Sequence, residues 1–283
     1  MQKTRSPDVK KAELRIAAAE GCGNRFIIVD RLKELARGSL TGKARASLGK
    51  TLCEKFPATD SILLISAPKS ETASAMMRIL EKDGSESDMC GNGIRCVAKY
   101  LRDAHAFPES MLIETKAGIR KVGHTKGNTY AVEMGKVAVN IRPIFETQIN
   151  GTSRNVYFAN SGEPHAVIFL TDVSKLNIDK IGRQVRRNPI FGAGGSNVNF
   201  VQIINEDTIR VRTYERGVEG ETEACGTGAT ASAAMAVKRG IVHSKIINVI
   251  CNGGVLKITY DGVNAILEGP ANVFQTKDIL LNL

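Results

Sequence analysis

Several features are scarce in this 283-residue sequence, and each absence narrows the choice of protein class. Tryptophan is missing, and only 5% of the residues are aromatic. No apolar run reaches the roughly 18 residues that a membrane-spanning helix needs, so we expect no transmembrane segment. The segment 1–11 is charged and has no apolar core, which argues against a secretory signal. We expect it to be a short solvated tail on a cytoplasmic protein.

Disulfide and metal patterns are missing as well. The six cysteines are spread along the chain and form no Cys-x-x-Cys pair, so we expect reduced thiols rather than a disulfide framework. Cys90 and Cys96 are six residues apart with no histidine close to either, which is a poor spacing for zinc. We therefore expect no metal site. Cys53, Cys96 and Cys251 are predicted to be small core residues.

Positive charge is in excess, but it is not arranged as a nucleic-acid surface. The formal net charge is +10, from 39 Lys and Arg residues against 29 Asp and Glu residues. The nearest approach to a basic run is Arg183, Arg186 and Arg187, and no aromatic residues are interleaved with it. A basic surface attracts anionic small molecules equally well, so nucleic acid is not the expected partner.

One stretch occurs twice and is the most informative feature of the chain. Residues 86–93 read Glu-Ser-Asp-Met-Cys-Gly-Asn-Gly, and residues 221–228 read Glu-Thr-Glu-Ala-Cys-Gly-Thr-Gly. An apolar stripe at i, i+3, i+4 and i+7 from Ile94 predicts a helix after the first copy. The alanine-rich run 227–238 predicts a helix after the second copy. The repeat indicates a duplicated fold with one thiol from each half.

The order of expected elements is also repeated. Strands, a helix after the Cys-Gly motif and further strands follow one another in both parts of the chain. Three strands, with a break at Glu268-Gly269-Pro270, are expected to end the chain. This order predicts two α/β halves with mostly antiparallel sheet. We expect one half to span 1–135 plus 271–283 and carry Cys90, and the other to span 136–270 and carry Cys225.

A cysteine at the start of a helix has a distinctive chemistry. The positive end of the helix dipole and the free backbone N–H groups favour thiolate over thiol, and the same N–H groups can bind a carboxylate. If two such sites face each other, one thiolate can remove an α-proton from an amino acid while the opposite thiol protonates the other face. This arrangement suits a two-base racemase or epimerase that uses no cofactor.

The sequence resembles the diaminopimelate epimerase family from about Gly21 to its end. The most specific matches are 90–96, 214–222 and 224–229, and the segments 83–86, 197–200 and 268–271 also fit. The resemblance implies a fold of the α/β (α+β) kind with two pseudo-symmetric halves, each a mainly antiparallel sheet wrapped around a central helix. It implies cofactor-independent epimerisation of LL-diaminopimelate to meso-diaminopimelate in lysine biosynthesis.

The resemblance also implies roles for individual residues. Cys90 and Cys225 would be the acid–base pair, and Asn24 would contact the substrate at its reacting end. At the distal end, Asn197 and Arg216 would bind the second amino acid group of the substrate. The reacting carboxylate would be held by the backbone of Gly91, Asn92, Gly226 and Thr227. His165 and Glu215 would tune the pKa values of the thiols, and Glu215 would also meet a substrate ammonium.

Four positions depart from the family pattern. Arg25 replaces an aspartate, and Ser61 ends a segment that usually reads Gly-x-Asp-Gly or Gly-x-Asp-Gln. Glu81 and Glu163 stand where the family has asparagine. Two neutral amides have thus become carboxylates, which favours a more cationic distal group than diaminopimelate carries.

Two alternatives stay open. One is a racemase or epimerase of another amino acid, and Glu81 and Glu163 favour a basic one. The other is a non-catalytic basic binding protein on the same fold. An isomerase of the phenazine-biosynthesis type is not expected, because both cysteines are kept. A homodimer is compatible with the sequence, which does not show whether Cys90 and Cys225 can form a disulfide.

Overall fold

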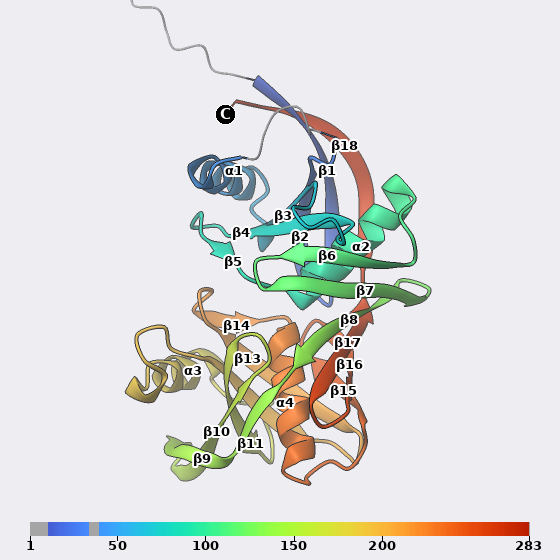
Figure 1. Cartoon of the computed structure of the whole chain (residues 1–283). Helices are drawn as coiled ribbons and strands as arrows, with labels where there is room; N and C mark the ends of the chain where they lie inside the picture. The colour runs from blue at the N-terminus through green and yellow to red at the C-terminus, as the bar shows by residue number, and fades with distance from the viewer. Residues whose placement is uncertain (1–10, 34–39, 283) are drawn as a thin grey trace, which may run out of the picture.

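The computed structural model describes residues 11–33 and 40–282. The charged segment 1–10, which the sequence predicts to be a tail, lies outside this range. Figure 1 shows two lobes stacked on each other, with the N-terminal strands and α2 in one lobe and α4 in the other. Within the described residues, no helix is both long and apolar enough to cross a membrane.

The first part of the chain contains eight strands and two helices among the described residues. They are β1 (Lys11–Gly21), β2 (Asn24–Asp30), α1 (Gly42–Lys55), β3 (Ser61–Ser66), β4 (Ala75–Leu80), β5 (Glu86–Ser87), α2 (Gly91–His105), β6 (Ser110–Thr115), β7 (Gly118–Lys126) and β8 (Thr129–Lys136). The helix α2 is the central one, and the whole stripe predicted from the sequence, Ile94, Val97, Ala98 and Leu101, is buried.

The second part repeats this order. Its elements are β9 (Ala138–Ile149), β10 (Thr152–Asn160), β11 (Pro164–Leu170), α3 (Ile178–Arg186), the 3-10 helix η2 (Pro189–Phe191), β12 (Asn197–Ile203), β13 (Thr208–Glu215), β14 (Gly220–Thr222), α4 (Gly226–Lys238), β15 (Ile246–Cys251), β16 (Gly254–Tyr260), β17 (Asn264–Pro270) and β18 (Asn272–Asn282). The helix α4 is buried continuously from Gly226 to Ala236. Its alanines are small enough for strands to pack on every side of it.

The pairing of strands shows that β1 to β8 correspond to β10 to β17. The pair β2–β3 is parallel and so is β11–β12, while β4–β6 is parallel and so is β13–β15. Most other pairs in both parts are antiparallel, as predicted. The two parts join where β8 and β17 pair antiparallel, with Val132 opposite Leu267.

The last strand returns to the first lobe. Strand β18 pairs antiparallel with β1, with Leu14 opposite Ile279, and both views show it beside β1. In the same way β9 pairs with β10. This pattern supports our proposal that the halves are 1–135 plus 271–283 and 136–270.

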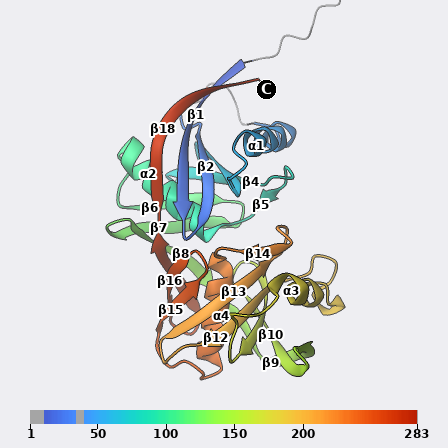
Figure 2. The same ribbon diagram turned by 180° about the vertical axis from the view of Figure 1, so that it is seen from behind.

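The prediction of three strands after α4 was wrong, because there are four. The Glu268-Gly269-Pro270 segment ends β17 rather than breaking a strand, and only Ala271 separates β17 from β18. With one residue between them, two strands in different lobes resemble one long strand in the sequence. Figure 2 shows how β18 continues from the junction into the upper lobe.

Candidate active site

Each of the two repeated cysteines is the N-cap residue of a central helix. Cys90 precedes α2 and Cys225 precedes α4, and both have extended backbones. Strands β5 and β14 end two to three residues before the cysteines and fix where each helix begins. The sequence therefore presents each thiol beside the free N–H groups of a helix start.

The two helix starts meet between the halves. A Cβ atom added to Gly226 would lie 3.4 Å from the Cα atom of Gly91, and one added to Gly91 would lie 3.7 Å from the Cα atom of Gly226. Both added atoms would also lie 3.3 Å from the side chain of Leu267. Only glycine allows this approach without displacing a neighbour. The structure thus brings the two copies of the motif together, as the sequence predicts.

The rest of the repeated motif supports the site from both sides. The hydroxyl of Ser87 donates to Glu81 over 2.6 Å, and the hydroxyl of Thr222 donates to Glu215 over 2.9 Å. Leu80 pairs with Glu86 as Tyr214 pairs with Glu221, so Glu81 and Glu215 occupy equivalent places after β4 and within β13. The equivalence of Glu81 and Glu215 was missed from the sequence, although Ser87 and Thr222 at the same motif position were a usable signal.

The first acidic residue of each motif has a structural function. Glu86 pairs with Arg45 at 2.5 Å and lies 3.7 Å from Arg78. Glu221 accepts two hydrogen bonds of 2.7 Å from Arg212, in the bidentate geometry that suits guanidinium and carboxylate. These pairs anchor β5 to α1 and β4, and β14 to β13, so they fix the strands that lead to the two thiols.

Burial controls the protonation of the two thiols. It raises the pKa of Cys90 to about 11, although a hydrogen bond from the Gly93 N–H to the sulfur lowers it. Burial also raises the pKa of Cys225 well above its usual value, and the Glu215 carboxylate raises it further. The sulfur of Cys225 makes no capping bond to α4 and lies 3.3 Å from the Thr227 hydroxyl. Burial thus favours the protonated thiol at both positions, and of the two sulfurs only that of Cys90 caps its helix.

Glu215 itself is close to titrating at neutral pH. Burial raises the pKa of Glu215 to about 7, the Thr222 hydrogen bond lowers it, and the charges of Glu81, Glu163 and Asp60 raise it. The charge of Glu215 raises the pKa of both thiols, which is consistent with the predicted tuning role. That role stays a prediction.

Asn92 connects the halves next to the thiols. Its amide nitrogen donates to Asn24 over 2.5 Å and to the Ala224 carbonyl over 3.1 Å, and its oxygen accepts from Arg95 over 2.9 Å. Arg95 is fully buried and also donates to the carbonyls of Gly91 and Pro270. Arg95 was not predicted as a site residue, although an arginine inside the buried stripe of α2 was a visible signal.

The residues predicted to bind the distal end of the substrate, Asn197 and Arg216, lie close together. Their polar groups already have partners within the protein. The guanidinium of Arg216 hydrogen-bonds to Glu163, and the Arg216 N–H donates to the Asn197 side chain over 2.8 Å. The other end of the Asn197 amide donates to the Pro164 carbonyl over 3.2 Å. Asn197 thus positions Arg216 and β11, and direct substrate binding by its side chain stays a prediction.

His165 is buried and neutral. Burial lowers its pKa to about 3, and the positive charge of Arg216 lowers it as well. Its Nδ1 atom lies 3.0 Å from the side-chain amide nitrogen of Asn199. The side-chain oxygen of Asn199 accepts a hydrogen bond from the Thr213 hydroxyl. In this network Nδ1 accepts, so the proton sits on Nε2, which has no partner among the described residues. Its predicted effect on the thiols stays a prediction.

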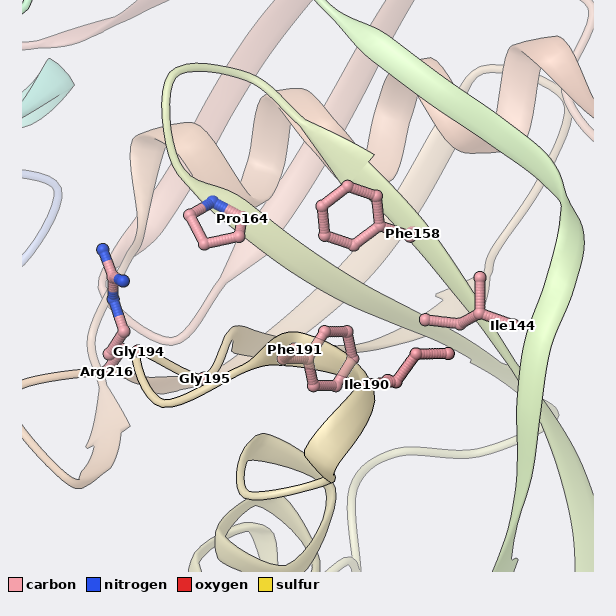
Figure 3. Close-up of a pocket in the computed structure, with 8 residues that line it drawn as sticks. All are labelled: Ile144, Phe158, Pro164, Ile190, Phe191, Gly194, Gly195 and Arg216. Carbon is pink, nitrogen blue, oxygen red and sulfur yellow. The ribbon is translucent and has the colours of Figure 1, made fainter.

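An apolar pocket of about 420 Å³ lies on the second lobe, away from both cysteines. Figure 3 shows Phe158 and Pro164 on one side, Phe191 and Ile190 on the other, and Arg216 at one end. Its lining residues are Ile144, Phe158, Pro164, Ile190, Phe191, Gly194, Gly195 and Arg216. Arg216 is the residue it shares with the predicted site. Among the described residues, no group of three or more His, Cys, Asp or Glu side chains is arranged to hold a metal ion.

Comparison with known proteins identifies the family. A sequence model described as diaminopimelate epimerase matches residues 16–139 and 157–274. The diaminopimelate epimerase of Aquifex aeolicus is 36% identical over 252 residues, which cover 85% of this chain and 88% of that protein. That of Methanocella arvoryzae is 35% identical over 285 residues, which cover 94% of this chain and 97% of that protein.

Solved structures show the same fold at low identity. A phenazine biosynthesis protein of the PhzF family from Bacillus anthracis has a TM-score of 0.72 at 15% identity, covering 95% of this chain and 100% of that chain. A hydroxyproline epimerase from Agrobacterium vitis has a TM-score of 0.68 at 16% identity, covering 95% and 92%. These likenesses confirm the predicted α/β class with two pseudo-symmetric halves. The chain belongs to the diaminopimelate epimerase family, as its sequence motifs predict.

Proposed function

We propose that the protein is an isomerase that epimerises LL-diaminopimelate to meso-diaminopimelate by two-base catalysis at Cys90 and Cys225. The observation that carries this proposal is the contact between Gly91 and Gly226, which sets the two thiol-bearing helix starts against each other. The relatives at 35–36% identity bear the name diaminopimelate epimerase. The reaction would belong to lysine biosynthesis in the cytoplasm, with a free amino acid as the partner.

The proposed proton transfer needs one thiolate and one thiol. The Cys90 thiolate takes the α-proton, so the C–H bond breaks and its electron pair is delocalised into the carboxylate. The Cys225 S–H then delivers its proton to the opposite face of the same carbon. The net result is inversion at carbon and a thiolate on Cys225, so neither an oxidant nor an organic cofactor is required. The reverse reaction uses the thiols in exchanged roles.

Helix electrostatics favour an anion between the thiols. The positive ends of α2 and α4 face each other where Gly91 meets Gly226, and such ends repel unless negative charge lies between them. The carboxylate of an amino acid supplies that charge and accepts hydrogen bonds from the free N–H groups. As the carbanion forms, the same groups stabilise the extra charge on the carboxylate.

Access to this position requires the halves to separate. Cys225 has an exposed fraction of 7%, and Asn92 has an exposed fraction of 1%. The Asn92 side chain spans from Asn24 in the first half to the Ala224 carbonyl in the second. We expect opening between the halves to admit the substrate and closure to exclude water before proton transfer.

Single cysteine variants test the function. General acid–base groups contribute about 10²- to 10⁴-fold to rates, so Cys90→Ser and Cys225→Ser should each lose epimerisation by at least about 100-fold. Conversion of LL-diaminopimelate is followed by chiral chromatography. Cys53→Ser, which removes a thiol from the buried face of α1, should stay close to the parent activity. Full activity in either site variant would overturn the two-thiol mechanism.

A further inference from the structure

Three carboxylates surround the predicted distal end of the site. Glu81 accepts hydrogen bonds from Ser61 over 2.7 Å and from Ser87 over 2.6 Å, one on each oxygen. Glu215 accepts one from Thr222. Glu163 is paired with the Arg216 guanidinium. The charges of Glu81 and Glu163 both raise the pKa of Glu215, which places the three groups within one electrostatic environment.

The cations in this environment are already engaged. Two positive charges act on Glu163, those of Arg216 and Lys116. Arg216 is hydrogen-bonded to Glu163 itself, and Lys116 pairs with Asp88 at 2.7 Å. A second carboxylate on a substrate would therefore have to displace Glu163 from Arg216. It would also enter a region where Glu81 and Glu215 repel it.

The arrangement of hydroxyl donors shows that Glu81 is held as an acceptor. Ser61 and Ser87 donate to different oxygens and leave further lone pairs on both. Glu215, its structural equivalent in the other half, is held by Thr222 in the same manner. Two oriented acceptors are what an ammonium or guanidinium group at the end of a side chain requires.

A buried donor nearby also lacks a partner. His165 follows Glu163 by two residues and feels the charge of Arg216, and its exposed fraction is 0%. Its Nε2 atom has no hydrogen-bond partner among the described residues. A buried N–H without a partner costs free energy, which a ligand with an acceptor group would recover.

We propose that the enzyme also inverts the α-carbon of amino acids whose side chain ends in a cation and carries no second carboxylate, such as lysine, ornithine or arginine. The proposal rests on the two-thiol chemistry proposed above. Glu163 occupies at Arg216 the place that the distal carboxylate of diaminopimelate would take. Glu81 and Glu215 then face the cationic end of the side chain. One thiolate takes the α-proton and the opposite thiol returns one, so the reaction again needs no further reactant.

The test compares lysine with norleucine in deuterium oxide. The two amino acids have the same carbon chain, and norleucine lacks only the terminal ammonium. Uptake of α-deuterium by the parent protein is measured by mass spectrometry for both and for diaminopimelate. Lysine should take up deuterium at least about tenfold faster than norleucine, since one well-placed charge pair contributes on the order of a tenfold change or more.

Two variants sharpen the test. Glu163→Asn frees Arg216 for a substrate carboxylate, and Glu81→Asn removes one of the acceptors for a cation. Each should lower the ratio of kcat/KM for lysine to kcat/KM for diaminopimelate by about tenfold or more. The ratio is measured on one preparation, so a partly unfolded sample does not change it. Glu133→Asn is the matched control, because Glu133 lies on the exposed side of β8, 3.4 Å from Lys121. It should leave the ratio unchanged.

The outcomes separate this inference from the proposed function. Uptake into diaminopimelate, with lysine no faster than norleucine, would overturn the inference and leave the proposed function standing. An unchanged ratio in both glutamate variants would overturn it as well. Uptake into lysine without uptake into diaminopimelate would support the inference and overturn the proposed substrate. Uptake into none of the three would overturn both.

Discussion

The two halves of the molecule share one framework around the thiols but differ in the side chains that face the substrate. Glu81 and Glu215 are equivalent, and so are Gly91 and Gly226, which meet at the helix starts. A reaction that removes a proton from one face and adds one to the other face needs this kind of likeness. The shared framework therefore supports the proposed proton transfer.

The differences lie at the start of β2 in the first half and at the start of β11 in the second half. Phe26 pairs with Ser61 in the first half, and His165 pairs with Asn197 in the second. Phe26 is therefore equivalent to His165, and Ser61 to Asn197. By the same register, Asn24 corresponds to Glu163. The first half thus offers an apolar ring and a neutral amide where the second half offers an imidazole and a carboxylate. Such asymmetry can distinguish the reacting end of a substrate from its distal end, and we propose that these positions decide substrate choice.

The largest effect is expected from breaking the contact between the helix starts. In Gly226→Ala the new Cβ would lie 3.3 Å from Leu267 and 3.4 Å from the Gly91 Cα atom, so the Leu267 side chain and the facing helix start must move by a few tenths of an ångström. A misplacement of about 1 Å can cost about 100-fold in rate, and we expect a loss of that size in kcat for diaminopimelate. Activity is measured beside thermal unfolding.

Gly42→Ala provides the matched control for this variant. Gly42 is likewise the first residue of a helix, α1, and the nearest atom to its added Cβ would be 4.0 Å away on Arg45. This variant should keep parental activity. If Gly226→Ala were as active as Gly42→Ala, the two helix starts would not need to touch for catalysis.

A smaller effect is expected at Arg95, which joins the central helix of one half to the junction with the other. Arg95→Lys keeps the buried charge but cannot reproduce the fork that contacts Asn92, Gly91 and Pro270. Leaving one or two buried acceptors unpaired should lower the free energy of unfolding by about 2 kcal/mol. Urea unfolding measures this change. Arg102→Lys, at a half-buried position of the same helix, keeps a cation beside Asp103 and Tyr130 and should change it by less than about 0.5 kcal/mol.

The smallest effect is expected on the pKa values of the thiols, and it distinguishes Glu81 from Glu215. The charge of Glu215 raises the pKa of both thiols, whereas that of Glu81 acts on Cys90. Glu215→Gln should therefore lower both pKa values, and Glu81→Gln should lower that of Cys90. A lower pKa leaves more of the cysteine as thiolate at pH 8, and faster iodoacetamide alkylation of each cysteine, followed by peptide mass spectrometry, reports it.

The pH dependence of alkylation is the internal control for Glu215. Because the pKa of Glu215 is raised to about 7, the parent protein loses that charge as the pH falls through this value. The parent and Glu215→Gln should then differ at pH 8 and converge by about pH 6. Equal alkylation rates at pH 8 would show that Glu215 does not tune the thiols.

The sequence predicted the thiols and the central helices because their signals are local. Cys90 and Cys225 repeat within eight-residue motifs, and the stripe beginning at Ile94 has the period of a helix. The pairing of β18 with β1 is not local, since it joins residues more than 250 positions apart. No periodicity within a short window reports such a contact, so the fourth strand after α4 was missed.

Contacts between predicted site residues were also beyond the reach of the sequence. The departure at Glu163 was visible, but its ion pair with Arg216 joins the residue before β11 to the residue after β13 and depends on the folded register. Asn197 was predicted to bind substrate, yet both ends of its amide contact the backbone of the protein. Residue type indicated chemistry here, and only tertiary structure shows which groups already have partners.

The most direct test of the central claim is the fate of the α-hydrogen early in the reaction in deuterium oxide. With one thiol on each face, the meso-diaminopimelate formed from LL-diaminopimelate should carry one deuterium at the inverted carbon. The remaining LL-diaminopimelate should still carry hydrogen, because the thiol that accepts the proton is not the one that donates. Product that retains the original hydrogen would mean that a single group serves both faces, which contradicts the account.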